Sequence, residues 1–495
     1  MRCDRGLYRR FFVLFCAAFM AIATPAIGAK PDRSKLPGPS GSTVWAPPTI
    51  QTWSMKNGIS VWFIEARQAP LITMELITAQ GAGTDNADKA GATAFMVDML
   101  DEGAGERDTL ALSDAFQLLA TDYSGSANTD GLTFSLNMLA DKLDESLALL
   151  ADVLRRPTFP AKEFERRKAQ RLASSLTAEA NLGRSASVVR KRVLFGTGYG
   201  GFISSGVRKT IESITLDDVK SRYKALVQPA GATIVVVGDV RRARLETALN
   251  AAFGDWNGAP TLKAKPVTLA KDLNGIYVVD FPGSAQSFVM MSRPVAGTDA
   301  PDYFESEVFN RPFSGAFTSR VNMNLREEKG YTYGARGSFG RLRQAGSYTI
   351  YAKVKRDTTR ASLDEMLKEL TAVRTDKPIT KKELQEAIGG LIKSFPGRFE
   401  RMNSVAGQLA RLVLDGYGTE WYQNWTQKIQ AVTLEAANQM AKTYTDPAEF
   451  AIVVAGDLSK IGQSLLGLNR PIHRYDAQGN YLGEGLPDSE KKASK

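Results

Sequence analysis

The sequence predicts an α+β protein of two homologous halves, each a mostly antiparallel sheet with a layer of helices. Two observations support this fold class. Segments with helical spacing of apolar residues alternate with short apolar segments typical of strands, and the same order of segments occurs twice in the 495 residues. A chain of this length also exceeds the size of one ordinary core, so at least two domains are expected.

The first 29 residues have the pattern of a secretory signal. Four arginines, at positions 2, 5, 9 and 10, precede an apolar run over residues 11–23 and then small residues at 26, 28 and 29. An uncleaved anchor is the alternative, but the run is shorter than the roughly 20 residues that a spanning helix needs. We therefore expect an exported protein, placed in a bacterial periplasm, with no stable membrane span after cleavage.

Cysteine content and charge exclude several classes of function. Cys3 and Cys16 both lie in the leader, so the mature chain can form no disulfide, cysteine nucleophile or thiolate metal site. The formal charge of +10 becomes +7 once the leader, with its four arginines and one aspartate, is removed. No basic run is interleaved with aromatic residues, so no nucleic-acid partner is expected.

The first half is expected at residues 50–254, after an extended arm rich in Pro, Gly and Ser at 30–49. Its apolar or alternating segments predict strands at 58–63, 71–77, 131–138 and 233–237. Its helical spacing predicts helices at 91–100, 110–120, 143–154, 164–180 and 215–226.

An internal repeat defines the second half. Residues 215–240, TLDDVKSRYKALVQPAGATIVVVGDV, align without gaps on residues 433–458, TLEAANQMAKTYTDPAEFAIVVAGDL. Residues 159–164 align on 379–384 at nearly the same offset. Agreement over separate helix and strand segments in one register indicates a duplication. The remaining chain then divides into a linker at 255–272, a second half at 273–470 and a loosely held tail at 471–495.

One segment of the second half carries candidate chemistry. Residues 318–328 have helical spacing, Gly330 can end the helix, and residues 331–339 alternate like a strand. This unit would bring Arg326 and Tyr333 to one end, where a guanidinium and a phenol could clamp a peptide carbonyl and stabilise an oxyanion. The alternative is structural: Arg326 pairs with a nearby carboxylate and Tyr333 is a half-buried strand tyrosine.

The segment SGAFTSRVNMNLREEKGYTYGARGSF, residues 314–339, closely resembles the C-terminal half of the pitrilysin/insulinase zinc peptidases, in the subfamily similar to mitochondrial processing peptidase. That family also has two homologous α/β halves. The resemblance implies that Arg326 and Tyr333, in the pattern R-x-x-x-G-x-x-Y, contact substrate at a zinc site on the opposite half or on a partner chain.

The zinc motif of that family is degenerate in this chain. The family carries an inverted H-x-x-E-H on a helix of its first half, where two histidines hold zinc and the glutamate activates water. Ala94, Val97 and Asp98 stand at those three positions. The third ligand, a glutamate, would fall in residues 172–177, which contain none. Alanine and valine cannot ligate a metal or accept a proton, so we expect this chain to bind no metal.

Other candidates have simpler interpretations. The only histidine, His473, is expected to be an exposed tail residue. Asp98, Asp101 and Glu102 lie at one-turn spacing and could attract a hard cation, but we expect a solvated helix end instead. The glycine-rich run 195–201 lacks the preceding strand and the lysine of a phosphate loop, so it is expected to be a turn between helices.

The resemblance implies a division of labour between two chains. We expect this chain to be the non-zinc subunit of a heterodimeric zinc metallopeptidase and to be inactive alone. Its partners would be a zinc-motif paralogue, which supplies zinc and the catalytic glutamate, and an unfolded peptide substrate. The alternative is a non-catalytic scaffold or peptide-binding protein of the same fold, comparable to the core subunits of a respiratory complex. A zinc-motif paralogue encoded by a neighbouring gene would favour the peptidase-subunit hypothesis over the scaffold.

Overall fold

The structure is a computed structural model that describes residues 45–487. The leader expected at 1–29 and most of the arm expected at 30–49 lie outside the described residues. Within residues 45–487, no helix combines the length and apolar character needed to cross a bilayer. From Pro47 onward, the two halves belong to one compact unit.

The first half contains a six-stranded sheet with the order β1-β2-β8-β3-β7-β6. The β2–β8 pair is parallel and the other four pairs are antiparallel. The strands are β1 Gln51–Ser54, β2 Ser60–Glu65, β3 Leu71–Thr78, β6 Asp122–Ala127, β7 Leu132–Leu139 and β8 Thr233–Gly238. A separate two-stranded ribbon joins β4 Gly103–Ala104 and β5 Arg107–Asp108.

The second half contains a seven-stranded sheet with the order β11-β12-β10-β13-β9-β14-β15. Strand β9 pairs in parallel with β13 and β14, and the remaining pairs are antiparallel. The strands are β9 Ile276–Asp280, β10 Gln286–Val295, β11 Thr332–Arg341, β12 Gly346–Lys355, β13 Ala451–Gly456, β14 Ile472–Tyr475 and β15 Tyr481–Glu484. The prediction of two α+β halves with mostly antiparallel sheets is confirmed.

Helices cover the sheets. The first half has α2 Ala92–Asp98, α3 Thr109–Leu118, α4 Leu143–Arg155, α5 Ala161–Glu179, α6 Leu182–Phe195, α7 Arg208–Ser213, α8 Leu216–Leu226 and α9 Arg242–Phe253, with short turns η1 Ala82–Thr84, η2 Ala87–Lys89 and η3 Ala140–Lys142. The second half has α10 Tyr303–Asn310, η4 Arg311–Gly315, α11 Arg320–Asn322, η5 Met323–Glu328, η6 Arg356–Thr358, α12 Thr359–Arg374, α13 Lys381–Ser394, η7 Pro396–Phe399, α14 Met402–Asp415, α15 Trp421–Gln430, α16 Leu434–Tyr444, η8 Pro447–Glu449 and α17 Leu458–Leu466.

The internal repeat corresponds to repeated structure. The order β2-β8-β3-β7-β6 in one sheet matches β9-β13-β10-β12-β11 in the other. The first pair of each series, β2–β8 and β9–β13, is parallel. The aligned segments also begin helices in the same way: Thr215 caps α8 by accepting from Asp218 N, and Thr433 caps α16 by accepting from Ala436 N. These caps satisfy amide groups that a helix leaves unpaired at its start.

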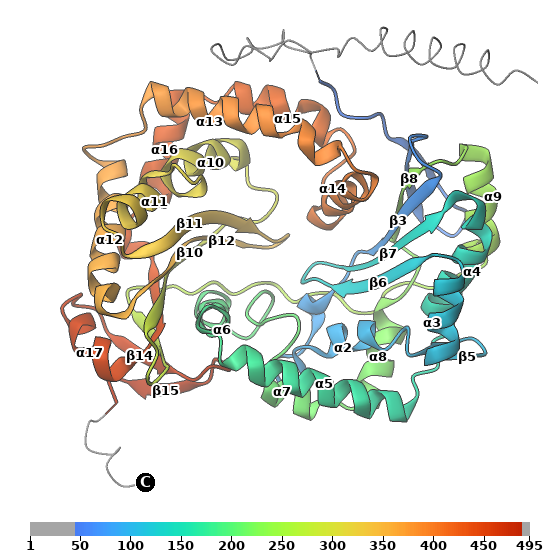
Figure 1. The fold of residues 1–495 in the computed structure, drawn as a ribbon, viewed down its shortest axis with the longest axis horizontal. Coiled ribbons are helices and arrows are strands. Elements are labelled where there is room, and N and C mark those ends of the chain that lie inside the picture. Colours follow the sequence, from blue (N-terminus) through green and yellow to red (C-terminus); the bar gives the residue numbers. More distant parts are fainter. Residues whose placement is uncertain (1–44, 488–495) are drawn as a thin grey trace, which may run out of the picture. The chain divides into compact units, whose positions relative to one another are not determined.

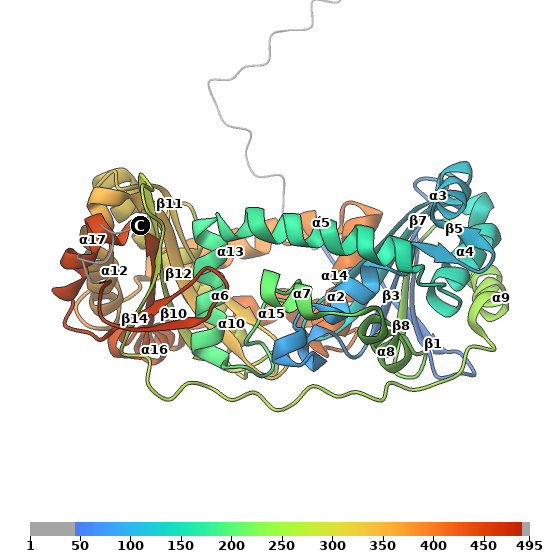
Figure 2. The same ribbon diagram turned by 90° about the horizontal axis from the view of Figure 1, so that it is seen from below.

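One helix from each half packs on the sheet of the other half (Figures 1 and 2). Helix α6 packs on β13, β10 and β9 of the second sheet, where its buried Ala186 and Val189 share a core with Met290 and Val453. Helix α14 packs on β3 and β8 of the first sheet. The two helices occupy equivalent places in the repeat, so the exchange is reciprocal.

The linker predicted at 255–272 forms no helix or strand and runs between the halves (Figure 2). It contacts both of them, since Thr261 N donates to Ala225 O of the first half and Val267 N donates to Gln344 Oε1 of the second half at 2.8 Å.

The prediction of a loose tail from residue 471 is wrong for residues 472–484. Strand β14 adds in parallel to β9, and β15 adds to β14, so this segment completes the second sheet. Ile472 is 4% exposed and belongs to the core. His473 is half-buried and its ring stacks on Tyr277 with centroids 5.1 Å apart, so it is not an exposed tail residue. The physical reason is that β9 would otherwise be an open edge.

Candidate functional site

Arg326 lies in the turn that precedes the edge strand β11. Its guanidinium stands over the Phe317 ring at 4.4 Å and its Nε lies 3.3 Å from Glu327 Oε1. The side chain is 34% exposed, so both contacts leave part of the guanidinium open to a ligand. Arg326 therefore pairs with a nearby carboxylate, as the structural alternative predicts, but its guanidinium is still accessible.

Tyr333 is 91% exposed near the start of β11. Together with Arg326 it lines a pocket of about 300 Å³, hereafter the Arg326 pocket, to which Gln286, Lys353 and Lys355 also contribute. The structural alternative predicted a half-buried Tyr333, and this prediction is wrong. Guanidinium, ammonium and phenol donors converge there, and such an array suits a carbonyl or carboxylate oxygen.

The helix predicted at 318–328 is a short α-helical turn, α11, followed by the π-helical η5. In η5 the amide of Lys329 donates to Asn324 O, five residues back. Gly330 then takes a φ of +65°, the left-handed region that glycine adopts without strain, and ends the turn. A wider turn of this kind is often found at functional sites. Here it sets the positions of Arg326 and Tyr333 relative to each other.

Asn322 fixes the start of the edge strand and was not found by sequence reasoning. Its Oδ1 accepts from Ala335 N at 2.8 Å, while its Nδ2 donates to Phe317 O at 2.6 Å. The register of β11 shifts between Thr332 and Ala335 at this point. Asn322 therefore links the helical turn, the Phe317 loop and the strand that carries Tyr333. A buried asparagine in an apolar helix stripe is the signal that could have revealed it.

The degenerate zinc motif lies on α2. Val97 is 3% exposed, and a Cβ added at Gly125 of β6 would come within 2.6 Å of it, so the two elements are in close contact. Asp98 Oδ2 lies 2.7 Å from Arg171 Nη2, and the Arg171 guanidinium stands 5.1 Å from the Phe95 ring. Burial lowers the pKa of Arg171, and the charge of Asp98 opposes that effect.

Arg171 immediately precedes residues 172–177, where the third zinc ligand of the family would fall. The positions of the degenerate motif therefore hold an apolar contact and an ion pair. Across residues 45–487, no group of three or more His, Cys, Asp or Glu side chains could hold a metal ion.

The solvated helix end expected for the neighbouring carboxylates is wrong for Glu102. This side chain is 1% exposed and pairs with Arg166, at 2.6 Å, and with Arg167. Burial raises the pKa of Asp101, and the charge of Arg167 partly offsets the effect. Arginines thus neutralise the carboxylates that might have attracted a cation.

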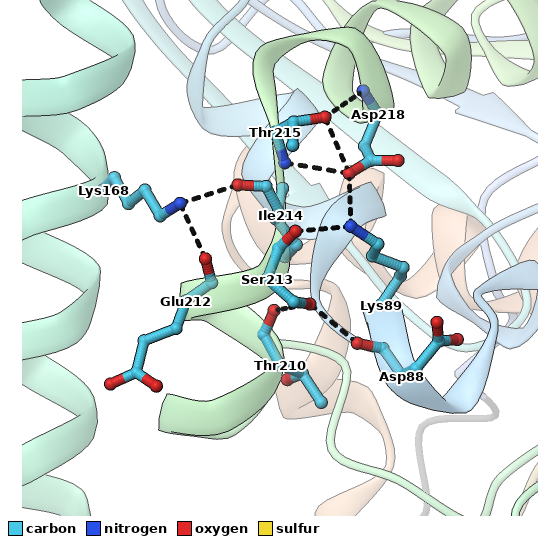
Figure 3. Close-up of polar contacts among 9 residues, drawn as sticks. All are labelled: Asp88, Lys89, Lys168, Thr210, Glu212, Ser213, Ile214, Thr215 and Asp218. Atoms are coloured by element: carbon cyan, nitrogen blue, oxygen red, sulfur yellow. Dashed lines mark hydrogen bonds and ion pairs between the residues drawn. The ribbon is translucent and has the colours of Figure 1, made fainter.

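Two lysines join the segments around α2 (Figure 3). Lys89 Nζ of η2 donates to Asp218 Oδ2 at 2.8 Å and also to Ser213 O. Lys168 Nζ of α5 donates to the carbonyl oxygens of Glu212 and Ile214, each at 2.8 Å. These contacts tie α5, α7 and α8 to the turn before α2. The hydrogen bonds of Lys89 and Lys168 therefore help to position α2 and α5, the two helices on which the zinc ligands of the family would lie.

The two sets of predicted residues do not share a pocket. Ala94, Val97 and Asp98 lie on α2 of the first half, and none of them lines the Arg326 pocket of the second half. The largest of the described pockets, about 660 Å³, is also separate and is lined by η1, η2, α8 and the linker. The chain thus has one accessible cationic site of the predicted kind and no metal site beside it among the described residues.

Comparison with known proteins identifies the family. Residues 61–194 match the insulinase (peptidase family M16) model, and residues 213–391 match the peptidase M16 inactive domain model. The "non-peptidase homolog YmxG" of Helicobacter pylori is 23% identical over 407 residues, which cover 81% of this chain and 93% of that protein. An "uncharacterized zinc protease" of Rickettsia felis is 20% identical over 64% of this chain and 76% of its own length.

Solved structures agree with the fold. A peptidase M16 inactive domain from Pseudomonas fluorescens superposes with a TM-score of 0.76 at 28% identity, covering 82% of this chain and 98% of that one. A protease from Helicobacter pylori has a TM-score of 0.75 at 15% identity, covering 83% of this chain and 100% of that one. A chain of complex III2 from Candida albicans has a TM-score of 0.68 at 13% identity, covering 84% and 99%. This chain therefore belongs to the M16 (pitrilysin/insulinase) peptidase family, as a member whose own zinc motif is lost.

Proposed function

We propose that this chain is the non-zinc subunit of a heterodimeric zinc metallopeptidase and that Arg326 and Tyr333 act at the zinc site of a partner. The partner would be a paralogue that carries H-x-x-E-H, and the substrate would be an unfolded peptide. Arg326 and Tyr333 would orient the scissile carbonyl and donate to the oxyanion that forms when the partner's zinc-bound water attacks it.

One observation carries this proposal: the exposed Tyr333 and the accessible Arg326 line one pocket in a chain whose zinc positions hold Ala94 and Val97. A phenol that is 91% exposed contributes little to the core, so packing gives no reason for it.

A non-catalytic scaffold or peptide-binding protein is the second candidate. The name of the Helicobacter pylori relative, a non-peptidase homolog, favours it. Both candidates use the same fold and neither assigns zinc to this chain. They differ in whether Arg326 and Tyr333 affect the rate of a reaction, and mutagenesis can measure that difference.

The test reconstitutes the chain with a zinc-motif paralogue from the same genome and measures cleavage of an unstructured peptide. Arg326→Gln or Tyr333→Phe should each lower kcat by about a hundredfold to a thousandfold, the effect of removing one oxyanion donor. Assembly, followed by size-exclusion chromatography, should not change. This chain alone should cleave nothing.

Matched controls come from the same chain. Arg242 also stands over an aromatic ring, Trp53 at 4.7 Å, and pairs with a nearby glutamate, Glu246 at 2.7 Å. Tyr481 is 53% exposed on a strand, as Tyr333 is on β11. Arg242→Gln and Tyr481→Phe should leave cleavage unchanged. A complex that assembles and cleaves equally well with Arg326→Gln and Tyr333→Phe would reject the catalytic role and favour the scaffold.

A further inference from the structure

Within residues 45–487, Arg190 on α6 has no carboxylate partner. Its Nη1 donates to Ser347 Oγ at 2.6 Å, and its Nε is buried with no hydrogen-bond partner. Burial lowers the pKa of Arg190 to about 10, and no charged neighbour among the described residues contributes to that change. The guanidinium is therefore still charged at neutral pH. A largely desolvated cation without a counter-charge costs free energy, and a bound anion would offset that cost.

The Arg190 side chain lines a pocket of about 390 Å³, hereafter the Arg190 pocket. Hydroxyl groups dominate its polar lining and come from Ser187, Ser338, Ser347, Thr349 and Tyr351. No carboxylate lines this pocket. A guanidinium surrounded by hydroxyl donors matches a carboxylate, which accepts bidentate hydrogen bonds from arginine.

The Arg190 pocket and the Arg326 pocket lie along one face of the same strand. Side chains alternate across a strand, so every second residue of β12 from Ser347 to Lys355 shares a face. Ser347, Thr349 and Tyr351 line the Arg190 pocket, and Lys353 and Lys355 line the Arg326 pocket. The eight residue steps between the ends correspond to about 27 Å, the span of an extended peptide of roughly eight residues.

Helix α6 closes one end of this face. A Cβ added at Gly183 would lie 3.0 Å from the Phe288 ring, which itself stacks on Tyr351 with centroids 5.7 Å apart. A chain that runs along β12 from the Arg326 pocket therefore meets α6 at the Arg190 pocket. A group near the end of that chain would be the one next to Arg190.

The charge along this face has one sign. The two pocket linings contain four cations against the single carboxylate Glu327, which already pairs with Arg326. Arg336 adds a further cation, because it is exposed and its Cα lies opposite Tyr351 in the register. A like-signed surface raises the local concentration of oppositely charged ligands.

We propose that the Arg190 pocket binds a carboxylate of an extended peptide whose other end lies in the Arg326 pocket. This inference rests on the proposed function only in that a peptide contacts Arg326 and Tyr333. The carboxylate comes from a peptide C-terminus or from an aspartate or glutamate side chain about eight residues away from the Arg326 contact. The substrates of the site are therefore peptides with a carboxylate at that spacing.

The test measures binding to the isolated chain, so neither partner nor zinc enters it. The probes are unstructured ten-residue peptides that carry the uncharged dye BODIPY at the N-terminus. They have one carboxylate at the C-terminus, one internal aspartate in a C-terminal amide, or no carboxylate. Fluorescence anisotropy should give at least about tenfold tighter binding for a carboxylate peptide, the usual effect of a hydrogen-bonded charge. The peptide that gains affinity identifies whether terminus or side chain is recognised.

Variants connect the effect to the pocket. Arg190→Gln should abolish the preference for a carboxylate, and Arg192→Gln, on the same helix but outside the pocket lining, should keep it. If Arg190→Gln does not fold, Ser338→Asp provides the same test from an exposed strand position, because the new carboxylate would compete for Arg190. Equal binding of all three peptides overturns the inference. A preference for the carboxylate that survives both Arg190→Gln and Ser338→Asp also overturns it. Failure of cleavage by the reconstituted complex would leave these binding results unaffected.

Discussion

Arg171 of α5 and Asp98 of α2 form an ion pair, 2.7 Å between Nη2 and Oδ2, at the positions around which the family builds its zinc site. The pair joins the same two helices that a metal would join. The first half has therefore kept the connection between α2 and α5 while replacing its chemistry. This replacement agrees with a division of labour in which the first half contributes structure.

The ion pair should be asymmetric in its contribution to stability. The Arg171 side chain is 13% exposed and its Nε has no partner, whereas Asp98 is 40% exposed. Asp98→Asn leaves a mostly buried cation unpaired and should lower the free energy of unfolding by about 1–3 kcal/mol. Arg171→Met leaves a carboxylate that water can reach and should cost less. The midpoint of urea unfolding compares the two, with Glu246→Gln in an exposed pair as the control. The reverse order would contradict this account.

Gly330 should be needed for its backbone conformation alone. Its φ of +65° is left-handed, and an added Cβ would meet no atom within 4 Å. Gly330→Ala should therefore destabilise by about 1 kcal/mol through backbone strain and should weaken any activity that depends on Arg326 and Tyr333. Gly389, inside α13, also has open space around it, and Gly389→Ala should be stabilising by about as much. Thermal unfolding of the two variants checks the opposite signs.

Glu75 should make stability depend on pH. Burial raises the pKa of Glu75, and the hydrogen bond from Ser135 only partly opposes it. The folded chain then holds this proton to higher pH than the unfolded chain, so stability falls as pH rises from about 4.5 through the raised pKa. Glu75→Gln should thus be more stable than the native chain at pH 7, by about 1 kcal/mol, and the gain should vanish near pH 4. Exposed Glu106→Gln should show no such gain.

Cutting the linker should not separate the halves. Lys263 and Lys265 are exposed in a segment without helix or strand, so a specific protease site placed there should be cleaved in the folded protein. Because α6 and α14 each cover the sheet of the other half, the two fragments should elute together in size-exclusion chromatography. Each half expressed alone should aggregate through its uncovered apolar face. Fragments that separate as soluble monomers would contradict the exchange.

Local patterns predicted much of the fold. The helices from residues 143 and 215 and the strands from 71 and 233 agree with the structure to within about one residue, because their apolar spacing and caps are local signals. The repeat predicted two equivalent halves, and the matching strand orders confirm it. Strand β14 was missed because IHRY has one core residue in four and is ordered only by pairing with β9.

The site was predictable only in part. The motif gave Arg326 and Tyr333, and the helix–glycine–strand pattern gave their proximity. The roles of Asn322, Arg171 and Arg190 depend on partners 13, 73 and 157 residues away, Ala335, Asp98 and Ser347, and such distances leave no local pattern. Helix α6 was not predicted, and no local pattern shows that it packs on the sheet of the other half.

The reciprocal exchange of α6 and α14 also constrains how the gene arose. A half-length ancestor with this topology would have left its own sheet uncovered unless a second copy donated the missing helix. Two copies of such a chain would cover both sheets as a dimer, so the exchange is consistent with dimerisation before a fusion through residues 255–272. Fusion then freed each copy to change by itself, since the two sequences no longer had to be identical. A fused chain can therefore hold Ala94, Val97 and Asp98 in one half and the arginine and tyrosine in the other.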